Sequence, residues 1–174
     1  MSFNKQAVYG FAAEKDVAMF FDLKRYFVVR YKKDESGLIR CCGPTFVIKD
    51  QEIVAPDMQI YKHGKCMFIE VKHTKTCTWD KYHNIWNLSL NLDQYYKYVK
   101  LNDASKIKLG IVWVVDGGIE ERTGLASPSG KFCASIDTLN KLEDRIFKSK
   151  DTELTSMIHW NQADLYEINK WNFE

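Results

Sequence analysis

One stretch, residues 52–72, alternates in a way that constrains the fold more than any other part of the sequence. Its two halves are rich in apolar residues and meet at His63-Gly64, a pair typical of a tight hairpin turn. We therefore predict two extended runs, 52–62 and 65–72, that pair as an antiparallel β-hairpin. A short run before them, 45–49, is expected to be extended as well.

The side chains of this hairpin sort onto two faces. If Lys62 pairs with Lys65, then Asp57 lies directly opposite Glu70, and strand alternation places Lys72 on the same face. The opposite face is apolar and consists of Met58, Ile60, Met67, Ile69 and Val71. The hairpin thus has one core face and one face that gathers two acids and a lysine.

Two carboxylates that face each other need a partner between them. Directly opposed Cβ atoms lie roughly 4.5–5.5 Å apart, where like charges are destabilising. A divalent cation with oxygen ligands, such as Mg²⁺, relieves this repulsion, and the Lys72 ammonium can orient a water or stabilise charge on a phosphate. The alternative is an ordinary surface hairpin in which Lys72 pairs with a carboxylate. Phe68 and Cys66 on the same face favour the first interpretation, because they partly enclose Glu70.

Apolar periodicity predicts the remaining elements. Helices are expected at 7–25, 91–101 and 136–147. Strands are expected at 27–31, 86–90 and 108–115, with a loop at 32–43 and a strand or short helix at 165–171. We interpret this mixture as an α/β (α+β) fold with one mixed central β-sheet flanked by helices.

Length and composition narrow the class of protein. A chain of 174 residues suits one domain, 1–174, with a core at 7–116 that carries the motifs and a C-terminal extension at 117–174. No apolar run is long enough to span a membrane, and the N-terminus lacks the apolar stretch of a signal peptide. The five cysteines form no CxxC pair and no regular disulfide pattern. We therefore expect a cytoplasmic protein with no membrane contact and no zinc or iron–sulfur site.

Charge is distributed unevenly along the chain. Residues 1–110 carry 18 Lys and Arg against 12 Asp and Glu, whereas residues 111–174 carry 7 against 11. A basic first part of this kind can face a polyanion. The histidines show no HxH or HxxxH spacing, so a histidine metal centre is not expected.

Pro56-Asp57, followed after twelve residues by Glu70-Val71-Lys72, resembles the motif of the PD-(D/E)xK nuclease superfamily. That superfamily includes restriction enzymes, archaeal Holliday junction resolvases and RecB-like recombination nucleases. The resemblance implies a restriction-endonuclease-like core and metal-dependent hydrolysis of DNA phosphodiester bonds. Structure-selective cleavage in recombination, repair or phage DNA processing would be consistent with it.

Two further segments are similar to members of this superfamily. Residues 10–14 resemble the first helix of resolvase-like members, which implies that Glu14 points into the metal site; the alternative is a half-exposed helix glutamate. Gln94 and Tyr98 match the QxxxY motif of RecB-like nucleases and share a helix face. Gln94 could instead serve a capping box with Asn91, and Tyr98 could cover the edge of the core.

The resemblance also implies roles for these residues. Asp57, Glu70 and the backbone carbonyl of Val71 would bind Mg²⁺ or Mn²⁺, and Glu14 would serve a possible second metal. Lys72 would orient the attacking water or stabilise the transition state. No cofactor beyond the metal is implied.

Contacts with DNA are expected from the segment that follows the predicted hairpin. Lys75, Trp79 and Lys81 offer basic and aromatic side chains there, and Arg40 offers another basic group in the loop before residue 45. The alternative is a solvated loop with Trp79 tucked into the fold. A homodimer is a further expectation from the resemblance. The competing hypothesis for the whole chain is a catalytically idle nuclease fold that binds nucleic acid or a protein partner.

Overall fold

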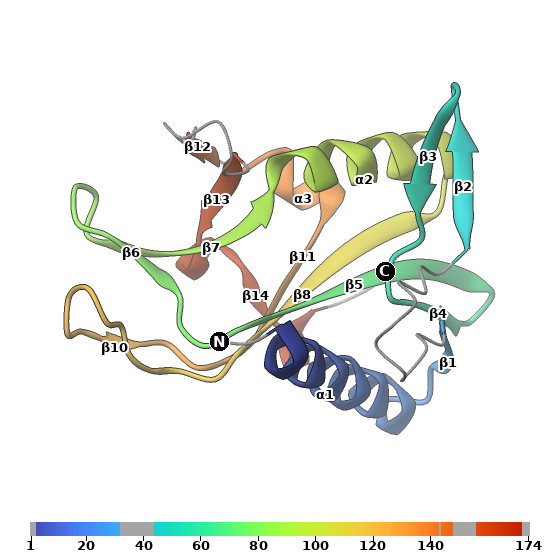
Figure 1. The fold of residues 1–174 in the computed structure, drawn as a ribbon. Helices are drawn as coiled ribbons and strands as arrows, with labels where there is room; N and C mark the ends of the chain where they lie inside the picture. The colour runs from blue at the N-terminus through green and yellow to red at the C-terminus, as the bar shows by residue number, and fades with distance from the viewer. Residues whose placement is uncertain (1–2, 32–43, 143, 148–155, 172–174) are drawn as a thin grey trace.

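The computed structural model describes residues 3–31, 44–142, 144–147 and 156–171 (Figure 1). The loop predicted at 32–43, with Arg40, lies outside these residues. Three α-helices are described, α1 (Phe3–Leu23), α2 (Leu92–Ser105) and α3 (Ile136–Leu139). The predicted first and second helices are therefore confirmed, and the second extends four residues beyond the predicted end.

A mixed six-stranded sheet forms the centre of the molecule. Its strand order is β1 (Phe27–Arg30), β4 (Met58–Lys62), β5 (Lys65–Thr74), β8 (Lys108–Val115), β11 (Gly130–Ser135) and β14 (Tyr166–Glu167). The neighbours β5 and β8 are parallel, and every other pair in this sheet is antiparallel. The prediction of one mixed central sheet is confirmed, and residues beyond 117 contribute two of its strands.

Smaller sheets extend from this centre. A four-stranded antiparallel sheet has the order β12 (Asp144–Phe147), β13 (Met157–Asn161), β7 (Ile85–Asn91) and β6 (Thr78–Asp80). The remaining strands form two antiparallel hairpins. One pairs β2 (Thr45–Ile48) with β3 (Gln51–Val54), and the other pairs β9 (Gly118–Ile119) with β10 (Ala126–Ser127). Two short 3-10 turns, η1 (Gln162–Asp164) and η2 (Ile168–Lys170), lie near the C-terminal end.

Apolar side chains bury both faces of the central sheet. On one face, α1 packs its Ala13, Val17 and Phe21 against one side of β4 and β5. On the other face, α2, α3 and the four-stranded sheet pack around Trp113 and Trp160. Figure 1 shows α1 below the central strands and α2 above them. Because both faces are covered, Glu70 in the middle of β5 is buried.

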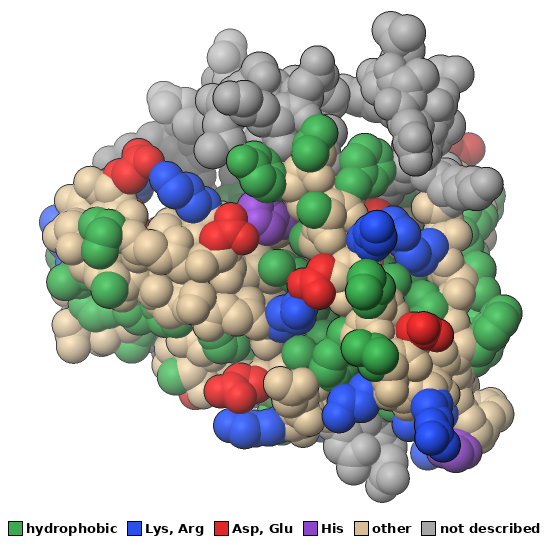
Figure 2. All heavy atoms as spheres, turned by 90° about the horizontal axis from the view of Figure 1, so that it is seen from below, with side chains coloured by type: hydrophobic (Ala, Val, Ile, Leu, Met, Phe, Trp, Pro, Cys, Tyr) green, Lys and Arg blue, Asp and Glu red, His purple; other side chains and the backbone are tan. Residues whose placement is uncertain are grey.

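The face of the molecule on the α1 side has a mixed surface. Figure 2 shows hydrophobic, acidic and basic side chains interspersed over the described part of this face, without one continuous basic patch. The excess of basic residues in the first part of the sequence therefore does not gather into a single surface there. No helix among the described residues is long and apolar enough to span a membrane.

The register predicted for the β4–β5 hairpin is confirmed. Lys62 pairs with Lys65 and Met58 pairs with Ile69, as the predicted alternation requires. His63 and Gly64 have φ angles of 50° and 75°, which allows the two-residue turn to follow the twist of the strands.

The prediction of one extended run over 52–62 is wrong. The chain leaves β3 after Val54 and enters β4 at Met58, so Asp57 precedes the strand instead of lying within it. Pro56 explains the break, because proline has no N–H to donate to a strand ladder. The N–H of Ala55 instead donates to the carbonyl of Pro44 at 2.8 Å.

The prediction of a helix over 136–147 is also wrong. The helix α3 ends at Leu139, and the chain continues into β12, which pairs with β13. Ile136 and Leu139 are buried at helical spacing, so the local pattern is helical only for this first turn. Strand pairing with a distant segment then overrides local propensity. The segment predicted at 165–171 contains both expected forms, β14 followed by η2.

The C-terminal segment is closely fitted to the central sheet. The ring of Trp171 lies over Gly110 of β8, where an added Cβ would meet the ring at 2.2 Å. Trp171 thereby packs against the apolar cluster beneath α1. Only a residue without a side chain leaves room for this contact.

Candidate active site

Asp57 enters the site from the end of the β2–β3 hairpin. Its Oδ2 accepts a hydrogen bond from the backbone N–H of Val71 at 2.8 Å, and 9% of the residue is exposed. Its backbone carbonyl accepts from the N–H of Tyr31 at 3.3 Å. These bonds fix the Asp57 carboxylate beside β5, at the same level as Glu70.

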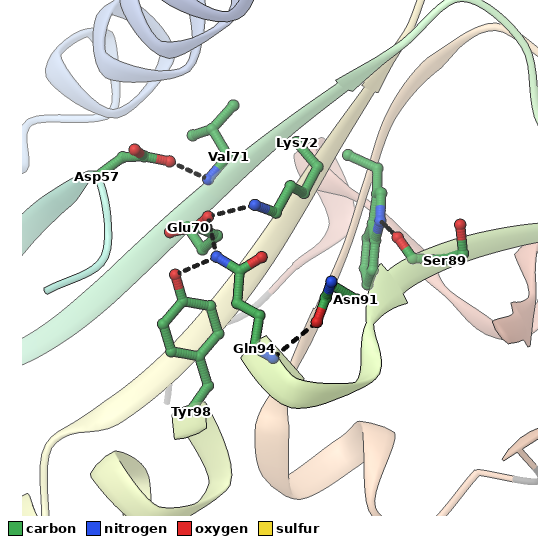
Figure 3. A network of polar contacts seen from close by, with 9 residues as sticks. Asp57, Glu70, Val71, Lys72, Ser89, Asn91, Gln94 and Tyr98 are labelled. Atoms are coloured by element: carbon green, nitrogen blue, oxygen red, sulfur yellow. Dashed lines mark hydrogen bonds and ion pairs between the residues drawn. The ribbon is translucent and has the colours of Figure 1, made fainter. Parts of the chain in front are cut away.

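Glu70 and Lys72 project from β5 toward the α2 side of the sheet. The Nζ of Lys72 lies 2.6 Å from Oε1 of Glu70. The Glu70 side chain is 6% exposed and the Lys72 side chain is 31% exposed, so the pair reaches from the interior to the surface. Figure 3 shows Asp57 approaching Val71 from one side while Glu70 and Lys72 face α2.

Gln94 of α2 completes this polar network (Figure 3). Its Nε2 donates to Oε1 of Glu70 at 3.1 Å and to the hydroxyl of Tyr98 at 2.8 Å. The Oδ1 of Asn91 accepts from the backbone N–H of Gln94 at 3.2 Å, so Asn91 does cap the helix. The side chain of Gln94 nevertheless points to Glu70, and Tyr98, 4% exposed, lies within the core. The structure shows the Asn91 cap and the contact of Gln94 with Glu70, and a functional role for that contact stays a prediction.

The electrostatics of the site disfavour a second negative charge. Burial and the nearby Asp57 carboxylate raise the pKa of Glu70, and the ion pair with Lys72 only partly opposes them. Burial and the Glu70 carboxylate raise the pKa of Tyr98 well above its ordinary value, which keeps its hydroxyl protonated. A cation close to Asp57 and Glu70 would stabilise the charged form of both acids.

The donor set fits a hard divalent cation. Two carboxylates and a backbone carbonyl are oxygen ligands of the kind that Mg²⁺ and Mn²⁺ prefer. Among the described residues, no group of three or more Asp, Glu, His or Cys side chains is placed to hold one metal ion. Glu14 is buried on α1, 6% exposed, but does not complete such a cluster with Asp57 and Glu70.

The residues expected to contact DNA lie in different settings. Lys75 is exposed and its Nζ lies 3.5 Å from Oε1 of Glu121. Trp79 is partly buried and packs against Trp86, with 4.9 Å between ring centroids, so the tucked alternative describes it in part. Lys81 is exposed and its Nζ lies 5.1 Å from the centroid of the Tyr82 ring.

Two further polar clusters escaped sequence reasoning. His73 bonds Oδ1 of Asp116 at 2.9 Å and stacks on Tyr9 of α1, with 5.6 Å between ring centroids. Asp80 is buried and accepts hydrogen bonds from the N–H groups of the two residues after Lys81. The second cluster had a recognisable signal, because an Asp that bonds N–H groups two and three positions ahead forms an Asx turn.

The central sheet and its hairpin define the structural class: the chain has a restriction-endonuclease-like fold. Among solved structures it is similar to Hjc of Archaeoglobus fulgidus, a Holliday junction resolvase from an archaeal hyperthermophile, with a TM-score of 0.51. The match covers 91% of each chain at 11% sequence identity, so it establishes the fold alone. No protein-family model matches the sequence, and no curated protein matches it.

Proposed function

We propose that the chain is a metal-dependent nuclease that hydrolyses phosphodiester bonds in DNA. The observation that carries this proposal is the meeting of Asp57 and Glu70 at one point of a buried sheet, with Lys72 bonded to Glu70. Burial and the nearby Asp57 raise the pKa of Glu70, and a bound cation would offset this by stabilising its charged form. The likeness of the fold to a Holliday junction resolvase agrees with this function.

The residues of the proposed site have two roles, metal binding and stabilisation of the reacting groups. Asp57, Glu70 and the carbonyl of Val71 would hold Mg²⁺ or Mn²⁺, which supplies charge neutralisation at the phosphate and a more acidic water when it is bound. Lys72 is partly exposed, so its ammonium is accessible to a bound substrate and can orient the attacking water or stabilise the developing charge.

Gln94 and Tyr98 act as positioning residues. The amide of Gln94 fixes Oε1 of Glu70 and is itself held by the Tyr98 hydroxyl. Groups of this kind orient metal ligands, and their removal typically lowers metal affinity or activity about 10- to 100-fold. We also propose that Glu14 binds a second metal through a water molecule. The chain is further expected to form a homodimer, which light scattering can test.

Cleavage of a labelled DNA panel tests the proposal. The panel contains plasmid, linear duplex, single-stranded, flap and four-way-junction DNA, each with Mg²⁺, with Mn²⁺ and with chelator. Wild type is compared with Asp57→Ala and Lys72→Ala, and Asp164→Asn, an exposed acid in η1, is the matched control. We expect metal-dependent cutting by wild type and the control only, and the preferred substrate identifies the structure selectivity.

The panel also separates the competing function. A folded wild type that cuts no member but binds one of them would overturn the nuclease and support an idle fold that binds DNA. Metal-dependent cutting that survives in Asp57→Ala would overturn the assignment of this site.

A further inference from the structure

The hairpin formed by β6 and β7 carries an unusually exposed aromatic side chain at its tip. Tyr82 is 85% exposed, more than any other large hydrophobic residue described. It lies in the four-residue tip 81–84 between the two strands. A side chain this exposed contributes little to folding, and its ring is accessible to a binding partner.

The tip is held rigidly. Oδ1 of Asp80 accepts the N–H groups of Tyr82 and His83 at 2.9 and 3.2 Å, and Oδ2 lies 2.7 Å from Nδ1 of His83. Asn84 closes the turn with a φ angle of 57°. The exposed ring of Tyr82 is therefore presented on a fixed backbone.

The base of the hairpin is anchored, and its two ends connect to the candidate active site. The Trp79 and Trp86 rings pack together below the tip, and Trp86 packs against the main core. The chain enters the hairpin from β5, which carries Glu70, and leaves it through β7 directly into α2, which carries Gln94. The hairpin is therefore joined in the chain to the two elements that carry Glu70 and Gln94.

The chemistry of the tip suits a nucleotide base beside its phosphate. The Tyr82 ring offers a flat apolar surface, and the exposed Lys81 ammonium lies 5.1 Å from its centroid. Stacking on an aromatic ring requires a free base face, which a continuous duplex does not offer away from its ends. We propose that Tyr82 stacks on an unpaired nucleotide, so that the hairpin selects DNA with a single-stranded or branched segment. This inference rests on the proposed function, since it names the substrate class of the same nuclease.

Binding without cleavage tests this inference. The probes are a fully paired duplex and the same duplex with an unpaired tail that contains 2-aminopurine, whose fluorescence falls when the base stacks. Ca²⁺ replaces Mg²⁺ to prevent cutting. The variants are Tyr82→Ala and Tyr82→Phe, with Tyr166→Ala as the matched control, because Tyr166 is an exposed tyrosine on the edge strand β14.

We expect Tyr82→Ala to bind the tailed DNA about tenfold more weakly and to lose the fluorescence change, while its affinity for the duplex stays the same. Tyr82→Phe and Tyr166→Ala should behave as wild type. A loss of equal size on both probes, or no loss on the tailed probe, would overturn the inference. Thermal melting of each variant shows whether the fold is intact, and the high exposure of Tyr82 predicts no change.

The two proposals fail in different ways. If wild type cleaves DNA but Tyr82→Ala keeps its preference for tailed DNA, only the role of the hairpin is wrong. If no variant cleaves DNA but tailed DNA binds through Tyr82, the nuclease is wrong and the stacking role stands. A folded wild type that binds neither DNA probe would overturn both proposals.

Discussion

Two buried acids on successive strands, Glu70 of β5 and Asp80 of β6, show opposite electrostatic behaviour. They are 5% and 8% exposed. Burial and the facing Asp57 raise the pKa of Glu70. Burial also acts to raise the pKa of Asp80, but hydrogen bonds from His83 and from the N–H groups of Tyr82 and His83 lower it overall.

Under the proposed function, this contrast distinguishes an acid that would bind metal from an acid that stabilises a turn. The charge of Asp80 is stabilised by the turn that Asp80 itself organises, so the fold alone explains its presence. Burial and Asp57 raise the pKa of Glu70 despite the ion pair with Lys72, which agrees with the cation binding proposed above.

The largest expected effect is on cleavage. Glu70→Gln should lower kcat about 100- to 1000-fold, because it removes a charged ligand and the partner of Lys72. Asp80→Asn should change kcat by less than about threefold, because its role is confined to the turn. Single-turnover cleavage of the preferred DNA measures both, and equal losses in the two variants would contradict the contrast.

A smaller effect is expected from Gln94→Ala. The loss of its hydrogen bond to Oε1 of Glu70 should weaken metal affinity by about 10- to 100-fold. Activity should recover at high Mg²⁺, which a purely structural role would not produce. A Mg²⁺ titration of the cleavage rate makes the measurement, with Lys97→Ala on the same helix as the control.

Metal should stabilise the fold only while Glu70 is present as a ligand. At a Mg²⁺ concentration of about 100 times Kd, binding adds roughly 2.7 kcal/mol to the free energy of unfolding. For a domain of this size, that raises Tm by about 5–11 °C. Wild type and Asp80→Asn should show this shift and Glu70→Gln should not. A shift retained in Glu70→Gln would place the metal elsewhere.

The smallest effects are on the metal-free protein, and they have opposite signs. Glu70→Gln should raise Tm by roughly 2–4 °C at neutral pH, because it removes an unfavourable buried charge. Asp80→Ala should lower Tm by a similar amount, since the loss of the bonds to the turn costs about 1 kcal/mol. Differential scanning calorimetry in chelator resolves both.

The pH dependence of these effects follows from the direction of each shift. The raised pKa of Glu70 gives stability at low pH that is lost as the pH rises through the folded value. The advantage of Glu70→Gln should therefore grow as the pH rises through that value. The lowered pKa of Asp80 gives stability above its unfolded value, about 3.9, that is lost as the pH falls. The disadvantage of Asp80→Ala should accordingly shrink in acid.

The sequence predicted those parts of the fold that depend on local patterns. The β4–β5 register follows from alternation and a two-residue turn, and β8 follows from one apolar run; both match the structure. The strands β11 and β13 were not predicted, because they pair with β8 and β7, which lie far away in the sequence. Contacts between distant segments do not impose a pattern within either segment.

The candidate site was predictable to a similar extent. The motif identified Asp57 and Glu70, and the structure places them together, but only the structure shows that Asp57 reaches the N–H of Val71 from outside the strand. Helix periodicity placed Gln94 on α2 without revealing that its amide bonds Glu70, since that depends on how α2 packs over the sheet. The position of Glu14 depends in the same way on the packing of α1.

The fit of Trp171 over Gly110 has a consequence for the order in which the protein is completed during synthesis. The two residues are separated by 61 positions in the sequence. At about 5–20 residues per second, a ribosome needs roughly 3–12 s to add them. During that interval β5, α2 and β8 have been made while the indole that covers Gly110 and the edge strand β14 have not. The nascent chain therefore carries its candidate catalytic residues for some seconds with part of the central sheet uncovered, a period in which chaperone binding would be useful.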